Sequence, residues 1–229
     1  VDPDIIDMQE VLHHQLEVLK TGLPEYTVVG VGREDGKTAG EYAPIFFKQA
    51  KYTLLDQNTF WLCEKPDSVG MVGWDAALTR IATWVKLQDK KTGQILMVVN
   101  THFDHIGTEA RRNSALLIIE KIKEIVGTSP AILTGDFNVS EDWDAYKTIT
   151  NNEFILKDAH KVAGKRTGVD FTYHNFGKIP AEKCEKIDFI FVTPQIRVIS
   201  SYIPFSQLND TLFLSDHNPE IVELEIEKS

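Results

Sequence analysis

The sequence predicts an α/β protein (of the α+β type) in which two β-sheets pack together and helices cover the outside. Short apolar runs that are typical of strands outnumber the segments with helical periodicity, and the helical segments fall between the strands. No internal repeat, low-complexity stretch or linker interrupts the 229 residues. We therefore expect residues 1–229 to form one domain.

The predicted elements follow from local patterns. Strands are predicted over residues 4–8, 26–31, 41–48, 52–61, 81–87, 95–101, 131–135, 187–192, 198–203 and 221–226. Helices are predicted over 11–20, 108–126 and 141–150. The second helix is the longest, and its apolar residues from Ala115 to Ile125 form one face. Ser140 is the expected N-cap of the third helix.

Composition narrows the class of protein. The hydrophobic fraction of 42% and the charged fraction of 25% are ordinary for a soluble globular protein. No apolar run approaches the roughly 18–20 residues that cross a bilayer, and no secretory signal is visible, so we expect a soluble protein whose compartment is not indicated. Cys63 and Cys184 form neither a metal-binding pattern nor a disulfide framework, and we expect both to be free.

One polar motif follows a buried strand. The apolar run 131–133 leads through a glycine to Asp136 and Asn138, whose side chains leave on the same face if the extended geometry persists. A carboxylate beside a carboxamide suits a hard cation, or a phosphate held through one. The alternative is a polar turn in which both side chains bond the backbone.

Polar groups recur where other predicted strands begin or end. Glu10 ends the first strand, His102 follows the strand at 95–101, Asp188 begins another, and Asp216 and His217 precede the last. Binding and catalytic sites are commonly built at such strand ends. Each group also has a structural explanation, such as a helix start for Glu10 or a core histidine for His102. All of these explanations would have to hold at once for the site to be absent.

The combination predicts hydrolysis of a phosphate ester. Such a substrate is anionic, and its transition state spreads charge over phosphoryl oxygens that a divalent metal neutralises. Mg²⁺ binds through few carboxylates and keeps water and substrate as further ligands. Glu10, Asp136 and Asp216 supply candidate carboxylates.

Two histidine–carboxylate pairs are candidates for proton transfer. A histidine oriented by a carboxylate can take a proton from water, and Asp188 with His217, or Glu41 with His102, could form such a pair. No Gly-rich phosphate loop is present, which argues against nucleotide-driven transfer. No Gly-x-Ser-x-Gly elbow supports acyl transfer.

Five short motifs stand in a recognisable order along the chain. They are Gln9-Glu10, Asn100-Thr101-His102, Gly135-Asp136-Phe137-Asn138, Lys186-Ile187-Asp188-Phe189-Ile190 and Ser215-Asp216-His217. Together they resemble the motifs of the endonuclease/exonuclease/phosphatase superfamily, the deoxyribonuclease I-like proteins. The resemblance implies a four-layer α/β sandwich of two mixed sheets. It also implies Mg²⁺- or Mn²⁺-dependent cleavage of phosphodiesters or phosphomonoesters.

The resemblance implies a metal-binding role for four residues. Glu10 is a metal ligand, and Asp216 lies near the metal. Asp136 and Asn138 position the attacking water and the scissile phosphate, with a second metal as a further option.

The resemblance also implies roles for the two histidine pairs. His217 is the general base or the group that stabilises the phosphoryl oxygens, and Asp188 orients it. His102 contacts phosphate and is braced by Glu41, which lies in the family's second strand pair.

Three further residues are candidates for substrate binding. Arg80 and Arg112 are expected to contact phosphate, because a guanidinium matches the geometry of an oxyanion. A surface ion pair is the alternative for each. Trp74 is a candidate for stacking on a base, with ordinary loop packing as its alternative.

The segments 73–77, 101–105 and 110–115 resemble a bacterial group that is distantly similar to the carbon-catabolite-repressor deadenylases. The superfamily has a first strand, upstream of the Gln-Glu motif, whose Asn helps to bind metal. Here Val1 lies nine residues before Glu10, so we expect that strand and the native N-terminus to be missing from this sequence.

These inferences lead to one expected function and two alternatives. We expect a monomeric phosphodiester hydrolase, with RNA or DNA ends among its candidate substrates. The net charge of −10 and the absence of a basic stripe favour a short nucleic acid or a small phosphodiester over a long nucleic-acid footprint. One alternative is a phosphomonoesterase for a small phosphate ester. The other is a catalytically silent sandwich that binds a phosphorylated ligand or a protein.

Overall fold

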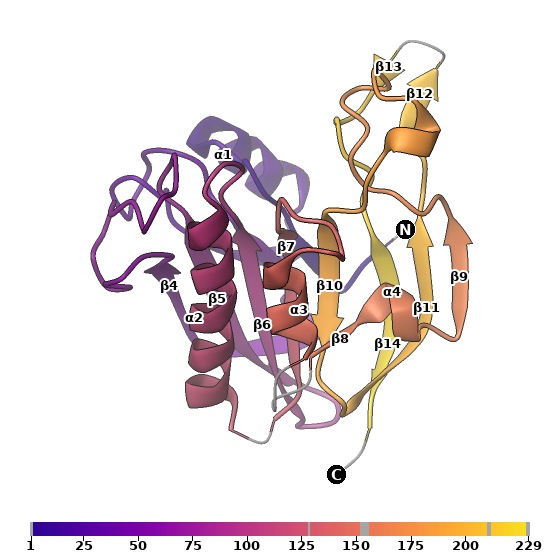
Figure 1. Ribbon diagram of the computed structural model, residues 1–229. Coiled ribbons are helices and arrows are strands. Elements are labelled where there is room, and N and C mark those ends of the chain that lie inside the picture. Colours follow the sequence, from indigo (N-terminus) through magenta and orange to yellow (C-terminus); the bar gives the residue numbers. More distant parts are fainter. Residues whose placement is uncertain (1, 128, 152–155, 210–211, 228–229) are drawn as a thin grey trace.

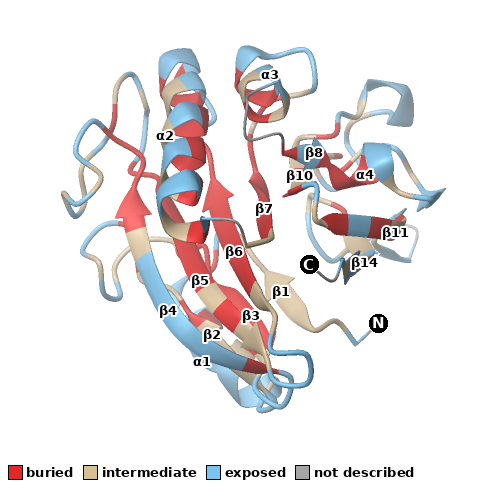
Figure 2. Ribbon diagram, turned by 90° about the horizontal axis from the view of Figure 1, so that it is seen from below, coloured by how far each residue is buried: buried red, intermediate tan, exposed pale blue. Residues whose placement is uncertain are grey.

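The computed structural model describes residues 2–127, 129–151, 156–209 and 212–227, and its elements form layers (Figure 1). One β-layer is a six-stranded sheet, and the other consists of two three-stranded sheets. Helices α2 (Thr108–Val126) and α3 (Asp144–Thr150) cover the six-stranded sheet, while α1 (His13–Gly22) covers the three-stranded sheet that contains residues 5–7, 26–29 and 45–48, on the opposite side of the molecule (Figure 2). The predicted fold class is therefore confirmed.

The strand order brings distant segments together. The six-stranded sheet has the order β4 (Tyr52–Trp61), β5 (Ile81–Asp89), β6 (Ile95–His102), β7 (Ala131–Asp136), β10 (Asp188–Val192) and β8 (Lys157–Asp158). Its neighbours are antiparallel except for β6 and β7, which are parallel. The other sheets have the orders β1 (Ile5–Asp7), β3 (Ile45–Lys48), β2 (Tyr26–Val29) and β14 (Ile221–Ile226), β11 (Ile196–Ile203), β9 (Lys165–Gly168). The remaining elements are α4 (Ala159–Val162), the 3₁₀ turn η1 (Ala181–Lys183) and the hairpin β12 (Gln207–Asn209) and β13 (Leu212–Phe213).

Apolar side chains fill the interfaces between the layers. Ile118 and Ile122 of α2 pack against the six-stranded sheet. Phe47, Val98 and Ile132 belong to the core between the two β-layers. Each interface takes residues from both of its layers, so neither β-layer buries its apolar face without the other. We propose on this ground that residues 1–229 form a single domain.

The predicted elements agree with the structure most closely where periodicity is long. The elements predicted over 52–61, 108–126 and 221–226 match at both ends. The third helix begins at Asp144 rather than at residue 141, with Trp143 as its N-cap, so the predicted cap at Ser140 is wrong. The Ser140 carbonyl instead accepts the Trp143 N–H in a turn that precedes the helix. Both cysteines are free, as expected, and none of the helices in the described ranges has the length and hydropathy to span a bilayer.

A groove of 1600 Å³ lies between the two three-stranded sheets of the second β-layer. Strands β1 and β14 both line it, and in the described part of the chain β1 pairs with β3 and β14 with β11. Each strand therefore turns one backbone edge toward the groove. Val98 and Ile132 of the six-stranded sheet also line it. The groove offers a place for the additional strand that the family resemblance implies, and that strand stays a proposal.

Asp7, at the end of β1, has a buried carboxyl group beside this groove. Its Oδ2 accepts a hydrogen bond from Thr134 Oγ1 at 2.8 Å, whereas its Oδ1 is buried with no hydrogen-bond partner among the described residues. Burial raises the pKa of Asp7 to about 7, although the Thr134 hydrogen bond opposes this. The folded protein therefore holds this proton more tightly than the unfolded chain does. Stability should fall as pH rises from about 4 to about 7.

We expect Asp7→Asn to remove this loss of stability, because the amide carries no charge to bury. The free energy of unfolding should rise by roughly 1–3 kcal/mol at pH 8 and change little at pH 4. Urea denaturation at both pH values measures the difference, with Asp56→Asn on an exposed strand position as the matched control. Equal effects of the Asp7 substitution at the two pH values would contradict the assignment.

Candidate active site

Strands β6 and β7 are parallel, so their carboxyl ends meet at one edge of the six-stranded sheet. His102 is the register partner of Asp136, and Thr101 is the partner of Gly135. Glycine is needed there because a Cβ at position 135 would lie 2.3 Å from the Thr101 carbonyl oxygen. As a result, His102 Nε2 lies 3.5 Å from Asp136 Oδ2.

In the turn after β7, the two carboxylate oxygens of Asp136 have different surroundings. Asn138 has a φ of 50°, in the left-handed region that Asn tolerates. Its backbone N–H donates to Asp136 Oδ1 at 2.8 Å, and its side-chain amide donates to the Phe103 carbonyl at 2.9 Å. The polar-turn alternative thus holds for these atoms. Asp136 Oδ2, however, faces two imidazoles, His102 at 3.5 Å and His217 at 4.0 Å.

His217 is oriented by Asp188 from the neighbouring strand. Because β10 pairs with β7, Asp188 lies opposite Asp136, and its Oδ2 is 2.7 Å from Nδ1 of His217. Burial lowers the pKa of His217, but the hydrogen bond to Asp188 and the charges of Asp188, Asp136 and Asp216 outweigh it and raise the pKa to about 9. Burial, and then the charge of Asp188, raises the pKa of Asp136 to about 7.

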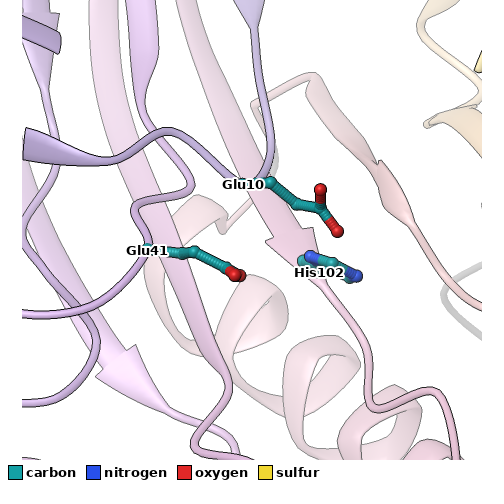
Figure 3. Close-up of side chains that lie close together, drawn as sticks. All are labelled: Glu10, Glu41 and His102. Carbon is teal, nitrogen blue, oxygen red and sulfur yellow. The ribbon is translucent and has the colours of Figure 1, made fainter. Parts of the chain in front are cut away.

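A second group combines Glu10, Glu41 and His102, with one ligand atom of each within 4.8 Å of the others. Figure 3 shows the three side chains together, each from a different segment. Glu10 follows β1 and has a φ of 59°, a strained conformation for glutamate that is typical of functional positions. The strand predicted over 41–48 begins only at Ile45, so Glu41 lies ahead of β3. Among the described residues it forms an ion pair with Arg33 rather than a hydrogen bond with His102.

The His102 imidazole is neutral in this setting. Burial, followed by the charges of Arg80 and Arg33, holds its pKa well below the usual value. Its Nδ1 is buried and has no hydrogen-bond partner among the described residues. A neutral imidazole with an unused nitrogen can contact a ligand at this edge.

The donor set fits a hard divalent cation. Burial raises the pKa of Glu10, and the negative charges of Glu41 and Asp216 raise it further. Three carboxylates with like charge therefore act on one another, a repulsion that a cation would relieve. Carboxylate oxygens are the ligands that Mg²⁺ and Mn²⁺ prefer.

Arg80 supplies positive charge next to these carboxylates. Its side chain is buried, with Nε 3.6 Å from Asp104 Oδ2 and Nη2 3.2 Å from His105 Nδ1. Nε and Nη1 have no hydrogen-bond partner among the described residues. Burial and the nearby Arg33 lower its pKa, while the charges of Asp104, Glu41 and Asp136 raise it. Nε faces the Asp104 carboxylate, so Nη1 is the buried donor that an anionic ligand could satisfy.

The other two predicted substrate contacts lie in different surroundings. Arg112 is exposed on α2, whereas its neighbour Arg111 is buried and donates to the Asp104 carbonyl at 3.0 Å. Trp74 lines a second pocket, of 480 Å³, together with residues of α2. The backbone N–H of Trp74 donates to Glu64 at 3.2 Å. The substrate-binding roles of Arg112 and Trp74 stay predictions.

Sequence reasoning missed Arg33 and Asp104. Arg33 is buried and bonds Glu41, but its position in a Gly-rich loop gave no pattern. Asp104 is buried and accepts three backbone N–H groups. Although burial raises its pKa, these hydrogen bonds lower it to about 2. Its position two residues after His102 was the available signal for this fixed negative charge beneath Arg80.

Comparison with known proteins decides the family. The sequence matches the Endonuclease/Exonuclease/phosphatase family over residues 1–217. The chain belongs to this family. The prediction made from the five motifs is thereby confirmed, and the Endonuclease/Exonuclease/phosphatase family consists of hydrolases that act on phosphoester bonds.

Three known proteins are similar to nearly the whole chain. A crystal structure of an endonuclease/exonuclease/phosphatase from Bacteroides vulgatus is 65% identical, with a TM-score of 0.95, and the match covers 98% of this chain and 85% of that one. A mannosyl-6-phosphatase from Bacteroides thetaiotaomicron is 38% identical, with a TM-score of 0.91 and coverage of 97% and 85%. An uncharacterised protein of Acanthamoeba polyphaga mimivirus, L388, is 29% identical, with coverage of 98% and 87%.

Proposed function

We propose that this protein is a divalent-metal-dependent phosphoesterase that uses Mg²⁺ or Mn²⁺. The observation that carries the proposal is that a group of carboxylates and a buried arginine lie together at one edge of the sheet. Glu10, Glu41 and Asp216 form a negative group that a cation would relieve, while Arg80 holds a buried Nη1 donor that an anion would satisfy. A phosphate ester bound through a metal meets both demands. Glu10 and Asp216, with Asp136 and Asn138 beside them, would hold the metal.

The reaction requires one bond to form and one to break at phosphorus. The oxygen of water bonds to phosphorus as the ester P–O bond breaks, water loses a proton, and the departing alcohol oxygen gains one. A bound metal supplies neutralisation of the charge on the phosphoryl oxygens. Asp136 Oδ2 faces two imidazoles, at 3.5 and 4.0 Å, and this oxygen is placed to take the proton from water.

The histidines act on the phosphoryl group in this proposal. With its raised pKa, His217 is protonated at neutral pH, which favours stabilisation of phosphoryl oxygens over the general-base alternative. Asp188 fixes the orientation of its ring. His102 is neutral and contacts phosphate as an uncharged group.

For the class of ester, we favour a small sugar phosphate. The 38% identical relative is a mannosyl-6-phosphatase, and the net charge of −10 disfavours a long nucleic-acid footprint. The buried guanidinium of Arg80, with its Nη1 unbonded among the described residues, suits the charge of a phosphomonoester. The phosphodiester substrate expected from the sequence is the second arm of the test.

Hydrolysis with and without metal tests the proposal. Mannose 6-phosphate, glucose 6-phosphate, bis-nitrophenyl phosphate and short single-stranded RNA and DNA are each incubated with Mg²⁺, Mn²⁺ or excess chelator. We expect inorganic phosphate from a sugar phosphate, with a loss of at least about 100-fold in chelator, because metal stabilisation of the transition state is worth several kcal/mol. Cleavage of the diester or oligonucleotides alone would assign the phosphodiesterase arm.

If no substrate is hydrolysed, metal binding distinguishes the remaining possibilities. Calorimetric titration with Mg²⁺ and Mn²⁺ is run in parallel with the assays. Absence of both turnover and metal binding would contradict the proposed function. Binding of metal and phosphate without turnover would favour the catalytically silent alternative.

A further inference from the structure

Lys186, just before β10, is a buried cation that the proposed chemistry does not use. Its side chain is 6% exposed, and its Nζ lies 2.8 Å from Glu220 Oε2. The same ammonium donates to the Asp188 carbonyl at 2.7 Å and lies 3.9 Å from the centre of the Phe189 ring. A buried charge is costly unless it is paired. These contacts therefore fix the ammonium in one place.

Glu220 connects this cation to the segment that carries His217. It lies three residues after His217, and its side chain is 3% exposed. Its Oε1 accepts a hydrogen bond from Ser201 Oγ at 3.2 Å, and Ser201 Oγ in turn lies 2.8 Å from His160 Nδ1. Both carboxylate oxygens of Glu220 are thus held, one by Lys186 and the other by β11.

One ammonium consequently joins the two segments whose side chains form the Asp188–His217 hydrogen bond. Asp188 reaches the ammonium through its own carbonyl, and the His217 segment reaches it through Glu220. We propose that the Lys186–Glu220 ion pair is a positioning device, which sets the geometry of the 2.7 Å contact between His217 and Asp188. The inference rests on the proposed function, because the contact matters through phosphoester hydrolysis.

The double variant Lys186→Met/Glu220→Met separates positioning from stability. It removes both charges together and leaves neither one buried without a partner, so we expect the fold to be retained. We expect kcat to fall by about 10- to 100-fold, because small displacements of positioned groups have effects of this size. KM and the melting temperature should stay close to wild type. The single variant Lys186→Met should lose stability as well, since it leaves Glu220 unpaired.

An exposed ion pair supplies the matched control. Arg197 and Glu225 form a pair between β11 and β14, and each side chain is 59% exposed. Arg197→Met/Glu225→Met likewise replaces one cation and one glutamate by methionine, and it should leave kcat, KM and melting temperature unaltered.

A second readout does not depend on activity. The His217 Nδ1 proton, held by Asp188, should give a downfield proton NMR signal that disappears in His217→Ala. In the Lys186/Glu220 double variant we expect this signal to move upfield or to be lost by exchange with water. A wild-type signal or a wild-type kcat in the double variant would overturn the proposal. If wild type itself is inactive, a shifted signal supports the positioning role and counts against the proposed function alone.

A milder substitution covers the case in which the double variant fails to fold. Glu220→Gln keeps the shape of the side chain and removes its charge. We expect a smaller fall in kcat, about three- to tenfold, with the same change in the His217 signal. An unchanged kcat in this variant would likewise overturn the proposal.

Discussion

Replacing His217 with alanine is expected to reduce phosphoester hydrolysis about a thousandfold while the protein stays folded. The imidazole is held by Asp188 at 2.7 Å and faces Asp136, and a fixed charged donor directed at phosphoryl oxygens contributes on this scale. Initial rates of phosphate release at saturating Mg²⁺ measure the loss. A melting temperature within a few degrees of wild type would show that the effect is chemical.

His14 provides the control for this substitution. It is exposed on α1, and His14→Ala should leave both rate and melting temperature unchanged. Retention of more than about a tenth of the wild-type rate in His217→Ala would contradict the mechanism.

Asp136→Asn is expected to move activity and stability in opposite directions. The amide retains the shape of Asp136 and can still accept the Asn138 N–H, but it cannot take a proton from water. We expect kcat to fall by about a thousandfold. Burial and the charge of Asp188 raise the pKa of Asp136 to about 7. Its ionisation above that pH therefore destabilises the folded state in chelator, and the loss develops as pH rises from about 4 to about 7.

The neutral variant should avoid that loss. In chelator at pH 8, its free energy of unfolding should exceed that of wild type by roughly 1–3 kcal/mol, and the difference should vanish near pH 4. Urea denaturation measures it, with Asp142→Asn at an exposed position as the control. A variant that is inactive but also less stable at pH 8 would show that Asp136 holds the fold rather than the chemistry.

Much of the site could be predicted because its residues lie next to strands that are recognisable from their apolar runs. The apolar run before Asp136 marks a buried strand, and its parallel pairing with β6 places His102 beside it. The members of both carboxylate–histidine pairs proposed from the sequence lie close together, since Asp188 bonds His217 and Glu41 lies near His102. Local pattern and motif order were sufficient for these.

Other features depended on contacts that no local pattern encodes. The ion pair of Glu41 with Arg33 joins two irregular segments, and such segments have no periodicity to read. That Arg111 is buried and Arg112 is exposed could have been predicted, because Arg111 lies on the same face of α2 as the apolar residues Ala115 and Ile118. Short elements such as β8 and α4 have too few residues for a pattern, and tertiary packing decides them.

The groove between β1 and β14 has a consequence for the reactive centre itself. Glu10 follows β1 on one side of the groove, and His217 precedes β14 on the other side. Gln9 and His217 both line the groove. In the described part of the chain, β1 and β14 belong to different sheets and are not hydrogen-bonded to each other. The distance between them is therefore set by their packing on the six-stranded sheet. Any polypeptide that bridged the groove would stiffen that spacing. The position of the Glu10 carboxylate, the proposed metal ligand, relative to the His217 imidazole should therefore depend on what fills the groove.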